Sequence, residues 1–293
     1  MALQVKDLSP TVGAEVQADL GMLLSGDEGS AFQELLLSKG MLLFRDVDVD
    51  DDQLLTFAKT LGVVRKEGHN PVNSVNFTKK GQALQQAYMH LTFYWHVDST
   101  YEDDPPLGAI LVPRSLPAPG IGDTEFVSTC AAYDSLSDAD KALIEDLEVV
   151  HTMTAFGSKI EADLPPEFRE SWVNFPERTF PMVRPQHRTG RKALTLGSSA
   201  DRVVGMDPAE STALIRRLNA HLVRPETVLR HAWRMGDVLI WDNTSTMHRA
   251  IAYPQDSGRK HARVQFYADE YKGDLSEFGD KKETLVRIRS GPE

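Results

Sequence analysis

The hydrophobic and polar positions of the first sixty residues predict two helices with a strand between them. Residues 27–37 carry apolar side chains at helical spacing and end before Gly40, a residue type that commonly terminates helices. Residues 41–47 begin with the continuous apolar run MLLF, which predicts a buried strand. Residues 50–61 start with acidic side chains and end at Gly62, as a second helix would.

The middle of the chain is less regular. Residues 67–86 are polar and predict a loop, residues 107–112 predict a short strand, and residues 137–147 predict a helix. Residues 156–181 contain aromatic side chains and four prolines without a sustained period. We expect this segment to be irregular and to act as a lid, because long loops in compact domains often close over binding sites.

The C-terminal part predicts one long helix followed by strands. Residues 207–222 are amphipathic, with Asp207 and Pro208 suited to the N-cap and first turn. Strands are expected at residues 229–234, 238–241 and 263–268, and a weakly packed polar tail at residues 272–293. Helices and strands do not alternate here, which disfavours a parallel α/β sheet. We predict a β-rich α+β fold, a sandwich or jelly roll with outer helices, in a single domain spanning residues 1–293.

Composition places the chain among globular proteins. Of its 293 residues, 41% are hydrophobic, and the longest apolar runs are far too short for a transmembrane helix, so no membrane partner is expected. The first ten residues lack the apolar core of a secretory signal. The single cysteine, Cys130, excludes an intramolecular disulfide and an all-cysteine metal site. We therefore expect a cytoplasmic protein with Cys130 buried.

The charge balance limits the partners. Asp and Glu number 43 against 32 Lys and Arg, a net charge of −11 with neutral histidine. Nucleic acid is not an expected partner, because phosphate binding needs a basic face. A few arginines in a pocket can still bind a small anion. Homo-oligomers are frequent among soluble proteins, and this possibility stays open.

The segment WHVDSTY, residues 95–101, carries the strongest chemical signal. His96 and Asp98 are two residues apart, so on a strand their side chains project from the same face and could approach one cation. The iron of mononuclear oxygenases takes two histidines and one carboxylate and keeps open positions. His248, which follows a short apolar strand and a polar turn, is the best second histidine.

Other metals and other histidines remain open on these residues alone. A short HxD motif is common by chance. Zinc competes for the same set, although it more often takes three or four nitrogen or sulfur ligands. His221 and His231 are expected to have no metal role, and the remaining histidines that could substitute are His69, His90, His151, His187 and His261.

Several short motifs, which include the two histidines and Asp98, occur along the chain. They are residues 95–100 (WHVDST), 122–126 (GDTEF), 190–192 (GRK), 231–237 (HAWRMGD), 241–243 (WDN) and 248–249 (HR), with Arg259 and Arg263. Together they resemble the family of taurine dioxygenase and 2,4-dichlorophenoxyacetate dioxygenase (TauD/TfdA). The joint match is far more specific than any one motif.

The resemblance implies a fold and a set of ligands. The fold is a double-stranded β-helix, or jelly roll, with flanking helices. The iron ligands are His96, Asp98 and His248. Thr124 and Arg259 match positions that bind the distal carboxylate of 2-oxoglutarate, for which a guanidinium can supply two parallel hydrogen bonds.

The expected substrate contacts are Arg263, His69 and Thr92. Arg263 matches a second arginine near the co-substrate and the substrate anion. If the chain from Arg259 to Arg263 is extended, both side chains lie on one face. His69 and Thr92 occupy positions that commonly contact substrate in this family, and Phe156 could close over the site as part of the lid. A small carboxylate or sulfonate facing Arg263 is therefore the predicted substrate class.

The resemblance also implies the reaction. Fe(II), 2-oxoglutarate and O2 would hydroxylate a C–H bond, with C–O or C–S cleavage or desaturation as variants, and give succinate and CO2. Halogenases of this kind need a small residue at the position of Asp98, so halogenation is disfavoured. Two alternatives remain: a non-catalytic jelly-roll binding protein, and a zinc-dependent hydrolase that uses the same three residues.

Overall fold

The fold of the chain is given by a computed structural model. It describes residues 3–65, 71–77, 87, 89–100, 102, 105–159, 172–173 and 175–268. His69 and the polar tail predicted at residues 272–293 lie outside the described residues. Within these ranges, none of the helices has the length and hydropathy needed to cross a membrane.

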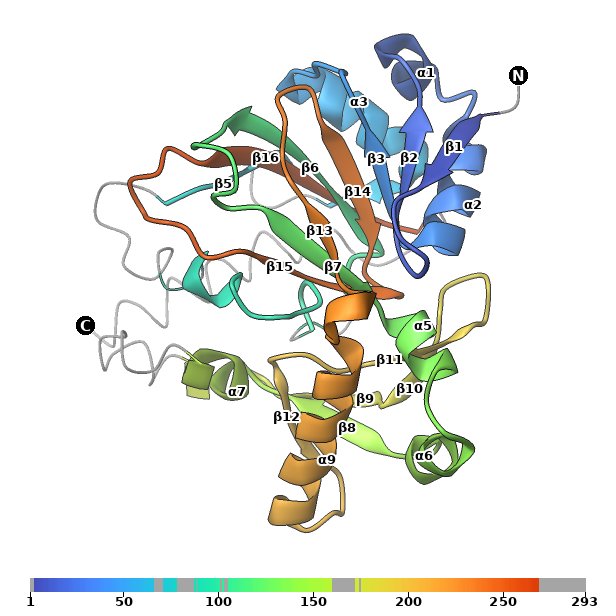
Figure 1. The fold of residues 1–293 in the computed structure, drawn as a ribbon, viewed down its shortest axis with the longest axis vertical. Helices are drawn as coiled ribbons and strands as arrows, with labels where there is room; N and C mark the ends of the chain where they lie inside the picture. Colours follow the sequence, from blue (N-terminus) through green and yellow to red (C-terminus); the bar gives the residue numbers. More distant parts are fainter. Residues whose placement is uncertain are drawn as a thin grey trace, which may run out of the picture.

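A large, mostly antiparallel sheet forms one wall of the molecule (Figure 1). Its strand order is β1-β2-β3-β14-β6-β16-β4, and β5 pairs with β16. The one parallel pair is β2 with β3. The strands are β1 Gln4–Asp7, β2 Ala14–Gln17, β3 Met41–Phe44, β4 Val63–Val64, β5 Asn73–Val75, β6 Gly108–Ser115, β14 Val238–Asp242 and β16 Lys260–Tyr267.

Helices cover the outer face of this large sheet. They are α1 Leu20–Ser25, α2 Gly29–Lys39 and α3 Asp51–Leu61. A capping box starts α3, in which Asp50 accepts from the backbone of Gln53 and Gln53 accepts from the backbone of Asp50. Buried side chains of the three helices form one apolar core with alternate residues of the strands, among them Ala262, Val264 and Phe266 of β16. The intervening residues of β16 therefore face the opposite side of the sheet.

A smaller sheet packs against that opposite face. Its strands are β7 Thr124–Ser128, β13 Leu229–His231 and β15 Thr246–Ala250, in the order β13-β7-β15. Phe126 of β7 packs with Trp241 of β14 and with buried residues of β3 and β6 in a second core between the sheets. The two sheets, almost entirely antiparallel, pack face to face over this second core as in a jelly roll, so the predicted fold class is confirmed.

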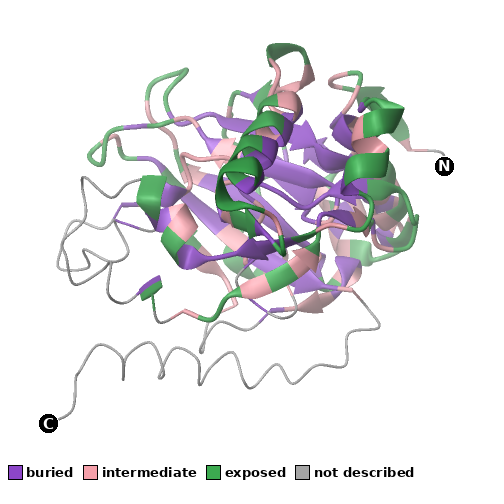
Figure 2. Ribbon diagram, turned by 90° about the horizontal axis from the view of Figure 1, so that it is seen from below, coloured by how far each residue is buried: buried purple, intermediate pink, exposed green. Residues whose placement is uncertain are grey.

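A third layer lies below the two sheets in Figure 1. It contains the sheet β12-β8-β9, the β10–β11 hairpin and the long helix α9. Figure 2 shows the buried strands at the centre with exposed helical surface outside them. The bounds are β8 Glu148–His151, β9 Arg178–Pro181, β10 Val183–Pro185, β11 Lys192–Leu194, β12 Ala200–Val203, α5 Thr129–Asp134, α6 Asp138–Ile144, α7 Met153–Gly157, α9 Pro208–Leu222 and a short 3-10 helix at Pro225–Thr227.

Most predicted elements are present, but two segments were misjudged. The helices expected at 27–37, 50–61 and 207–222 correspond to α2, α3 and α9. The loop expected at 67–86 contains β5, and the irregular segment expected at 156–181 ends in β9, which pairs with β8. Both strands are short and are stabilised by partners distant in sequence, which a local pattern cannot show. Residues 160–171 of the expected lid lie outside the described part of the chain.

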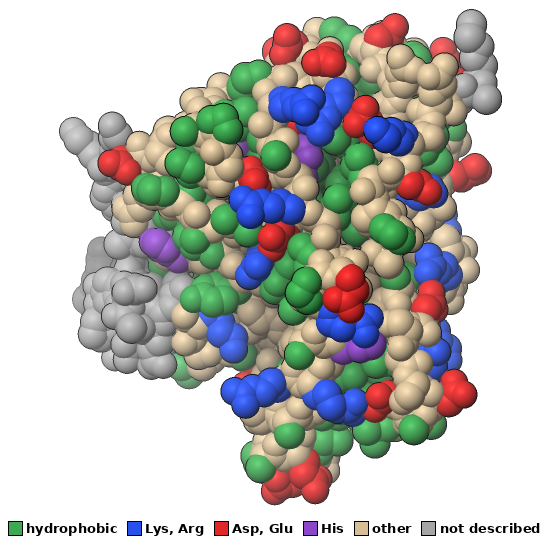
Figure 3. Space-filling view, in the orientation of Figure 1, with side chains coloured by type: hydrophobic (Ala, Val, Ile, Leu, Met, Phe, Trp, Pro, Cys, Tyr) green, Lys and Arg blue, Asp and Glu red, His purple; other side chains and the backbone are tan. Residues whose placement is uncertain are grey.

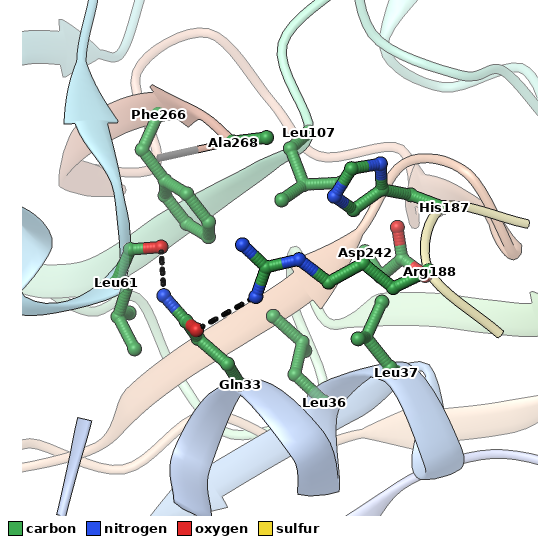
Figure 4. Close-up of a pocket in the computed structure, with 10 residues that line it drawn as sticks. All are labelled: Gln33, Leu36, Leu37, Leu61, Leu107, His187, Arg188, Asp242, Phe266 and Ala268. Carbon is green, nitrogen blue, oxygen red and sulfur yellow. Dashed lines mark hydrogen bonds between the residues drawn. The ribbon is translucent and has the colours of Figure 1, made fainter. Parts of the chain in front are cut away.

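A cavity beside α2 is too small to hold an organic substrate. It lies between helix and sheet, lined by residues that include Leu36, Leu107 and Phe266 (Figure 4). Its volume of about 10 Å³ is that of a single water position.

On the face drawn in Figure 3, acidic and basic side chains are interspersed.

Candidate active site

His96 and His248 lie directly opposite each other on adjacent backbone segments. They form an antiparallel bridge in which each backbone N–H donates to the other's carbonyl oxygen at 3.0 Å. His248 is on β15, so the His96 segment extends the smaller sheet by one position. The two imidazole rings are 4.3 Å apart between centroids. Backbone pairing thus places two nitrogen ligands side by side although 152 residues separate them.

Asp98 completes the group from a turn rather than from a strand. Residues 98–100 form a turn, and Ser99 has a left-handed backbone conformation with φ 58°. The expectation that a strand carries both His96 and Asp98 was therefore wrong, because only His96 is paired. The turn nevertheless places Asp98 Oδ1 3.8 Å from His96 Nε2 and 3.8 Å from His248 Nε2. The three buried side chains form a group with metal-ligand geometry in the part of the chain that the structure describes.

The electrostatics of this group suit a divalent cation. Burial lowers the pKa of His248 to about 3 and also lowers the pKa of His96, so both imidazoles are neutral and free to donate a lone pair. Burial alone would raise the pKa of Asp98, but the positive charge of Arg263 and the hydrogen bond from Gln265 keep it below its usual value. Two neutral imidazoles and one carboxylate are the donor set of non-haem Fe(II) oxygenases.

Neighbouring groups orient the two imidazoles. His96 Nδ1 donates to the carbonyl oxygen of Tyr94 at 2.7 Å, which leaves Nε2 to face Asp98. Phe126 stacks on the His248 ring at 5.9 Å, and Trp241 lies 4.6 Å from the same ring. Trp241 is 2% exposed and belongs to the core between the sheets. These aromatic rings exclude water from one side of the site.

Thr124 and Arg259 lie near the start of β7. The Arg259 side chain is 5% exposed, its Nε donates to the carbonyl oxygen of Gly122 at 2.9 Å, and its Nη1 donates to the Tyr253 hydroxyl at 3.4 Å. Gly122 allows this approach, since it has φ +70° and a Cβ there would lie 2.5 Å from Arg259 Cδ. Within the described ranges no carboxylate lies at ion-pair distance from Arg259. A buried guanidinium without a protein carboxylate fits the carboxylate of a small anion.

Comparison with known proteins decides the family. The family model described as taurine catabolism dioxygenase TauD, TfdA family matches residues 4–265. The chain belongs to the TauD/TfdA family.

Named relatives agree with this membership. The chain is 28% identical over 263 residues to (S)-phenoxypropionate/alpha-ketoglutarate-dioxygenase of Delftia acidovorans, covering 85% of this chain and 89% of that protein. It is 31% identical over 261 residues to alpha-ketoglutarate-dependent sulfate ester dioxygenase of Pseudomonas putida, covering 86% and 85%. The crystal structure of AAD-2 in complex with Mn(II) and N-oxalylglycine superimposes with a TM-score of 0.82 at 27% identity, covering 92% and 98%. The prediction of an alpha-ketoglutarate-dependent dioxygenase is confirmed, and the non-catalytic alternative is not supported.

Arg263, the second arginine expected from the TauD/TfdA pattern, lies beside the triad formed by His96, Asp98 and His248. Its Nη1 is 3.5 Å from Asp98 Oδ1, and its side chain is 27% exposed. The condition that the chain is a regular strand from Arg259 to Arg263 is not met, because Arg259 precedes β16 and the pairing register shifts between Lys260 and His261. The two arginines therefore contact different partners, Arg263 at Asp98 and Arg259 at Gly122.

The other predicted substrate contacts are only partly described. Thr92 lies beside β15, where its carbonyl oxygen accepts from the backbone of Ala250, but its hydroxyl donates to the carbonyl oxygen of Met89. Phe156 of α7 lies 5.8 Å from the His96 ring, so the first residue of the expected lid segment does reach the site. His69 cannot be placed because it lies outside the described residues.

Three residues near the site were missed in the sequence. Trp233 Nε1 donates to the Thr124 hydroxyl at 3.0 Å, Tyr253 lies under the Arg259 guanidinium at 4.8 Å, and Gln265 Nε2 donates to Asp98 Oδ2 at 3.3 Å. Gln265 is two residues after Arg263 on a predicted strand, so the period of two could have identified it. The partners of Trp233 and Tyr253 follow from tertiary packing and had no local signal.

His151 lies outside the metal group and gives the protein a pH-dependent stability. It is fully buried, and its Nδ1 is bonded to Ser199 Oγ at 2.8 Å. Burial lowers the pKa of His151 to about 4, from an ordinary value of 6.5. Between these two values the unfolded chain binds a proton that the folded protein does not, so stability falls as the pH falls through this window.

Replacing His151 with glutamine is expected to reduce that pH dependence. From about pH 6.5 to about pH 5, the wild type should lose about 1.6 kcal/mol of unfolding free energy through this histidine, and the variant should not. Urea unfolding of the metal-free proteins at both pH values measures the difference. An equal loss in wild type and His151→Gln would contradict the prediction.

Proposed function

We propose that the protein binds Fe(II) through His96, Asp98 and His248 and uses 2-oxoglutarate and O2 to oxidise a C–H bond of a small organic anion. The observation that carries the proposal is the buried group in which Asp98 Oδ1 lies 3.8 Å from the Nε2 atoms of both histidines. When bound, the iron would supply the activation of O2. The side chains hold the metal, orient the reactants and exclude water.

Thr124 and Arg259 are proposed to bind the distal carboxylate of 2-oxoglutarate. Arg259 is the buried guanidinium described above. Burial lowers its pKa, and a guanidinium keeps its positive charge in proteins. The N-oxalylglycine bound to AAD-2 has the 2-oxoglutarate skeleton with an NH in place of one CH2. Its binding to AAD-2 supports a binding site for 2-oxoglutarate in this chain.

The substrate is proposed to be a small organic carboxylate, sulfonate or sulfate ester whose anion faces Arg263. Arg263 is a partly exposed cation 3.5 Å from Asp98, and the Phe156 ring lies 5.8 Å from the His96 ring, where an organic group could pack. Relatives named for phenoxypropionate and for sulfate esters support the anionic class. His69, Thr92 and a lid within residues 156–181 are further proposed contacts, in a single-domain, cytoplasmic enzyme.

A substrate panel tests the proposal. Protein loaded anaerobically with Fe(II) should form succinate on addition of 2-oxoglutarate and O2, and one of a set of sulfonates, aryloxyalkanoates, alkyl sulfates and amino acids should raise the rate. Zinc-loaded protein should form none. Substrate hydrolysis by the zinc form, without succinate, would support the zinc-hydrolase alternative instead.

A further inference from the structure

We propose that Gln265 is a positioning residue that makes Asp98 bind the metal through one oxygen only. Its Nε2 donates to Asp98 Oδ2 at 3.3 Å, whereas Asp98 Oδ1 is the oxygen that lies 3.8 Å from both imidazole nitrogens. The two carboxylate oxygens thus have different partners before any metal is bound. This inference rests on the proposed function, because it assumes that the metal binds at the triad.

The direction of this hydrogen bond follows from charge. Asp98 is ionised and can only accept, so the Gln265 amide must present its NH2 group to Oδ2. The opposite amide orientation would place two acceptor oxygens against each other in a buried site, with no compensating hydrogen bond.

Gln265 is held in place by the strand that carries it. Gln265 is 2% exposed and pairs with Ala109 of β6. Its backbone carbonyl oxygen accepts from the backbone N–H of Arg65 at 2.9 Å. Val264 and Phe266 on either side are buried in the core beneath α2 and α3. The strand cannot turn about its axis without exposing those apolar side chains, so the Gln265 amide stays directed at Asp98.

A neutral amide suits this position better than a cation. Arg263 already lies 3.5 Å from Asp98 Oδ1, and a second positive charge at Oδ2 would compete with the metal for the carboxylate. An amide orients the carboxylate without adding charge. With Oδ2 engaged, the protein offers three ligand atoms, two nitrogens and one oxygen, and other coordination positions stay open for the co-substrate and O2.

Removing the amide donor is expected to weaken metal binding. Gln265→Met keeps the length of the side chain but cannot donate, and hydrogen-bonding partners of metal ligands typically contribute about 10- to 100-fold in affinity. We expect the dissociation constant for Mn(II), titrated into the metal-free protein without 2-oxoglutarate, to rise by about that factor. Gln265→Asn, whose shorter amide cannot span the distance, should behave alike and replaces Gln265→Met if that variant does not fold.

Gln186 provides a matched control. It is also a 2% exposed glutamine that donates to a buried carboxylate, Asp242 Oδ2, at 2.8 Å. Asp242 follows Trp241 on β14 and therefore points away from the face that carries the triad; it lines the small cavity in Figure 4. Gln186→Met should lower the melting temperature of the metal-free protein but leave the affinity for Mn(II) unchanged.

The Mn(II) titrations distinguish a failure of the proposed Gln265 role from a failure of the proposed metal site. If Asp98→Ala binds Mn(II) as the wild type does, the metal site itself is wrong, and the role of Gln265 fails with it. If Asp98→Ala loses Mn(II) while Gln265→Met and Gln265→Asn keep wild-type affinity, only the role of Gln265 is overturned. Equal weakening in Gln186→Met and Gln265→Met would also overturn it, since general loosening of the fold would then explain the effect.

Discussion

Replacing Asp98 with alanine is expected to abolish succinate formation and to lower metal affinity by more than about 100-fold. In the proposed metal site Asp98 supplies the anionic ligand, and its Oδ1 lies 3.8 Å from the Nε2 atom of each histidine. Its loss removes one of three protein ligands and the only negative charge among them, so the effect should exceed the roughly 10- to 100-fold typical of groups that merely orient a ligand. Succinate assays and Mn(II) titration measure both effects.

Two further variants make the test specific. Asp98→Asn keeps the shape of the side chain and removes its charge, so it should bind Mn(II) nearly as poorly as Asp98→Ala. His221→Ala removes a histidine of α9 that is bonded to Ser135 Oγ at 2.8 Å and lies outside the metal group, and it should keep wild-type activity. Full turnover by either Asp98 variant would exclude the assignment of the triad.

Replacing Arg259 with lysine is expected to raise the KM for 2-oxoglutarate by about 10- to 100-fold. Arg259 is 5% exposed and has no carboxylate partner in the described part of the chain. Lysine keeps the positive charge but cannot make two parallel hydrogen bonds to a carboxylate. A hydrogen bond to a charged group contributes about 1.5–3 kcal/mol, and about 1.4 kcal/mol corresponds to a factor of ten.

Metal affinity and a neighbouring arginine serve as controls for Arg259. The Mn(II) dissociation constant without 2-oxoglutarate should be unchanged in Arg259→Lys, because Arg259 contacts Gly122 and Tyr253 rather than the triad. Arg230→Lys alters a half-exposed arginine paired with Asp123 at 2.8 Å and should leave the KM unchanged. An unchanged KM in Arg259→Lys would move the co-substrate carboxylate elsewhere in the site.

The long, periodic elements could be predicted because their signals are local. Helix α9 has an amphipathic period together with Asp207 as N-cap and Pro208 in its first turn, and both lie within its own sequence. Strands β1, β2, β9 and β15 had no such signal. Each has five residues or fewer, and its stability comes from pairing with strands elsewhere in the chain.

The candidate site also has one part that the sequence predicted and another that depends on the tertiary structure. Residue types and their order predicted the triad, Thr124, Arg259 and Arg263 as site residues, because the family pattern is a property of the chain itself. Other features of the site depend on how the strands pair. They are the position of Asp98 in a turn, the register shift that separates Arg259 from Arg263, and the hydrogen-bond donors Trp233 and Gln265. The period of two along β16 places Gln265 on the same face as Arg263, but only the strand pairing shows that both side chains meet Asp98.

The sequence by itself determined that this chain is a TauD/TfdA-type protein with His96, Asp98 and His248 as candidate ligands, because motif identity and spacing are properties of the chain. Only the tertiary structure decided that His248 lies directly opposite His96, with its backbone bonded to it at 3.0 Å in both directions. It also decided which oxygen of Asp98 faces the two histidines. Both outcomes depend on the register of strands distant in sequence, and that register is set by packing the two sheets around one core.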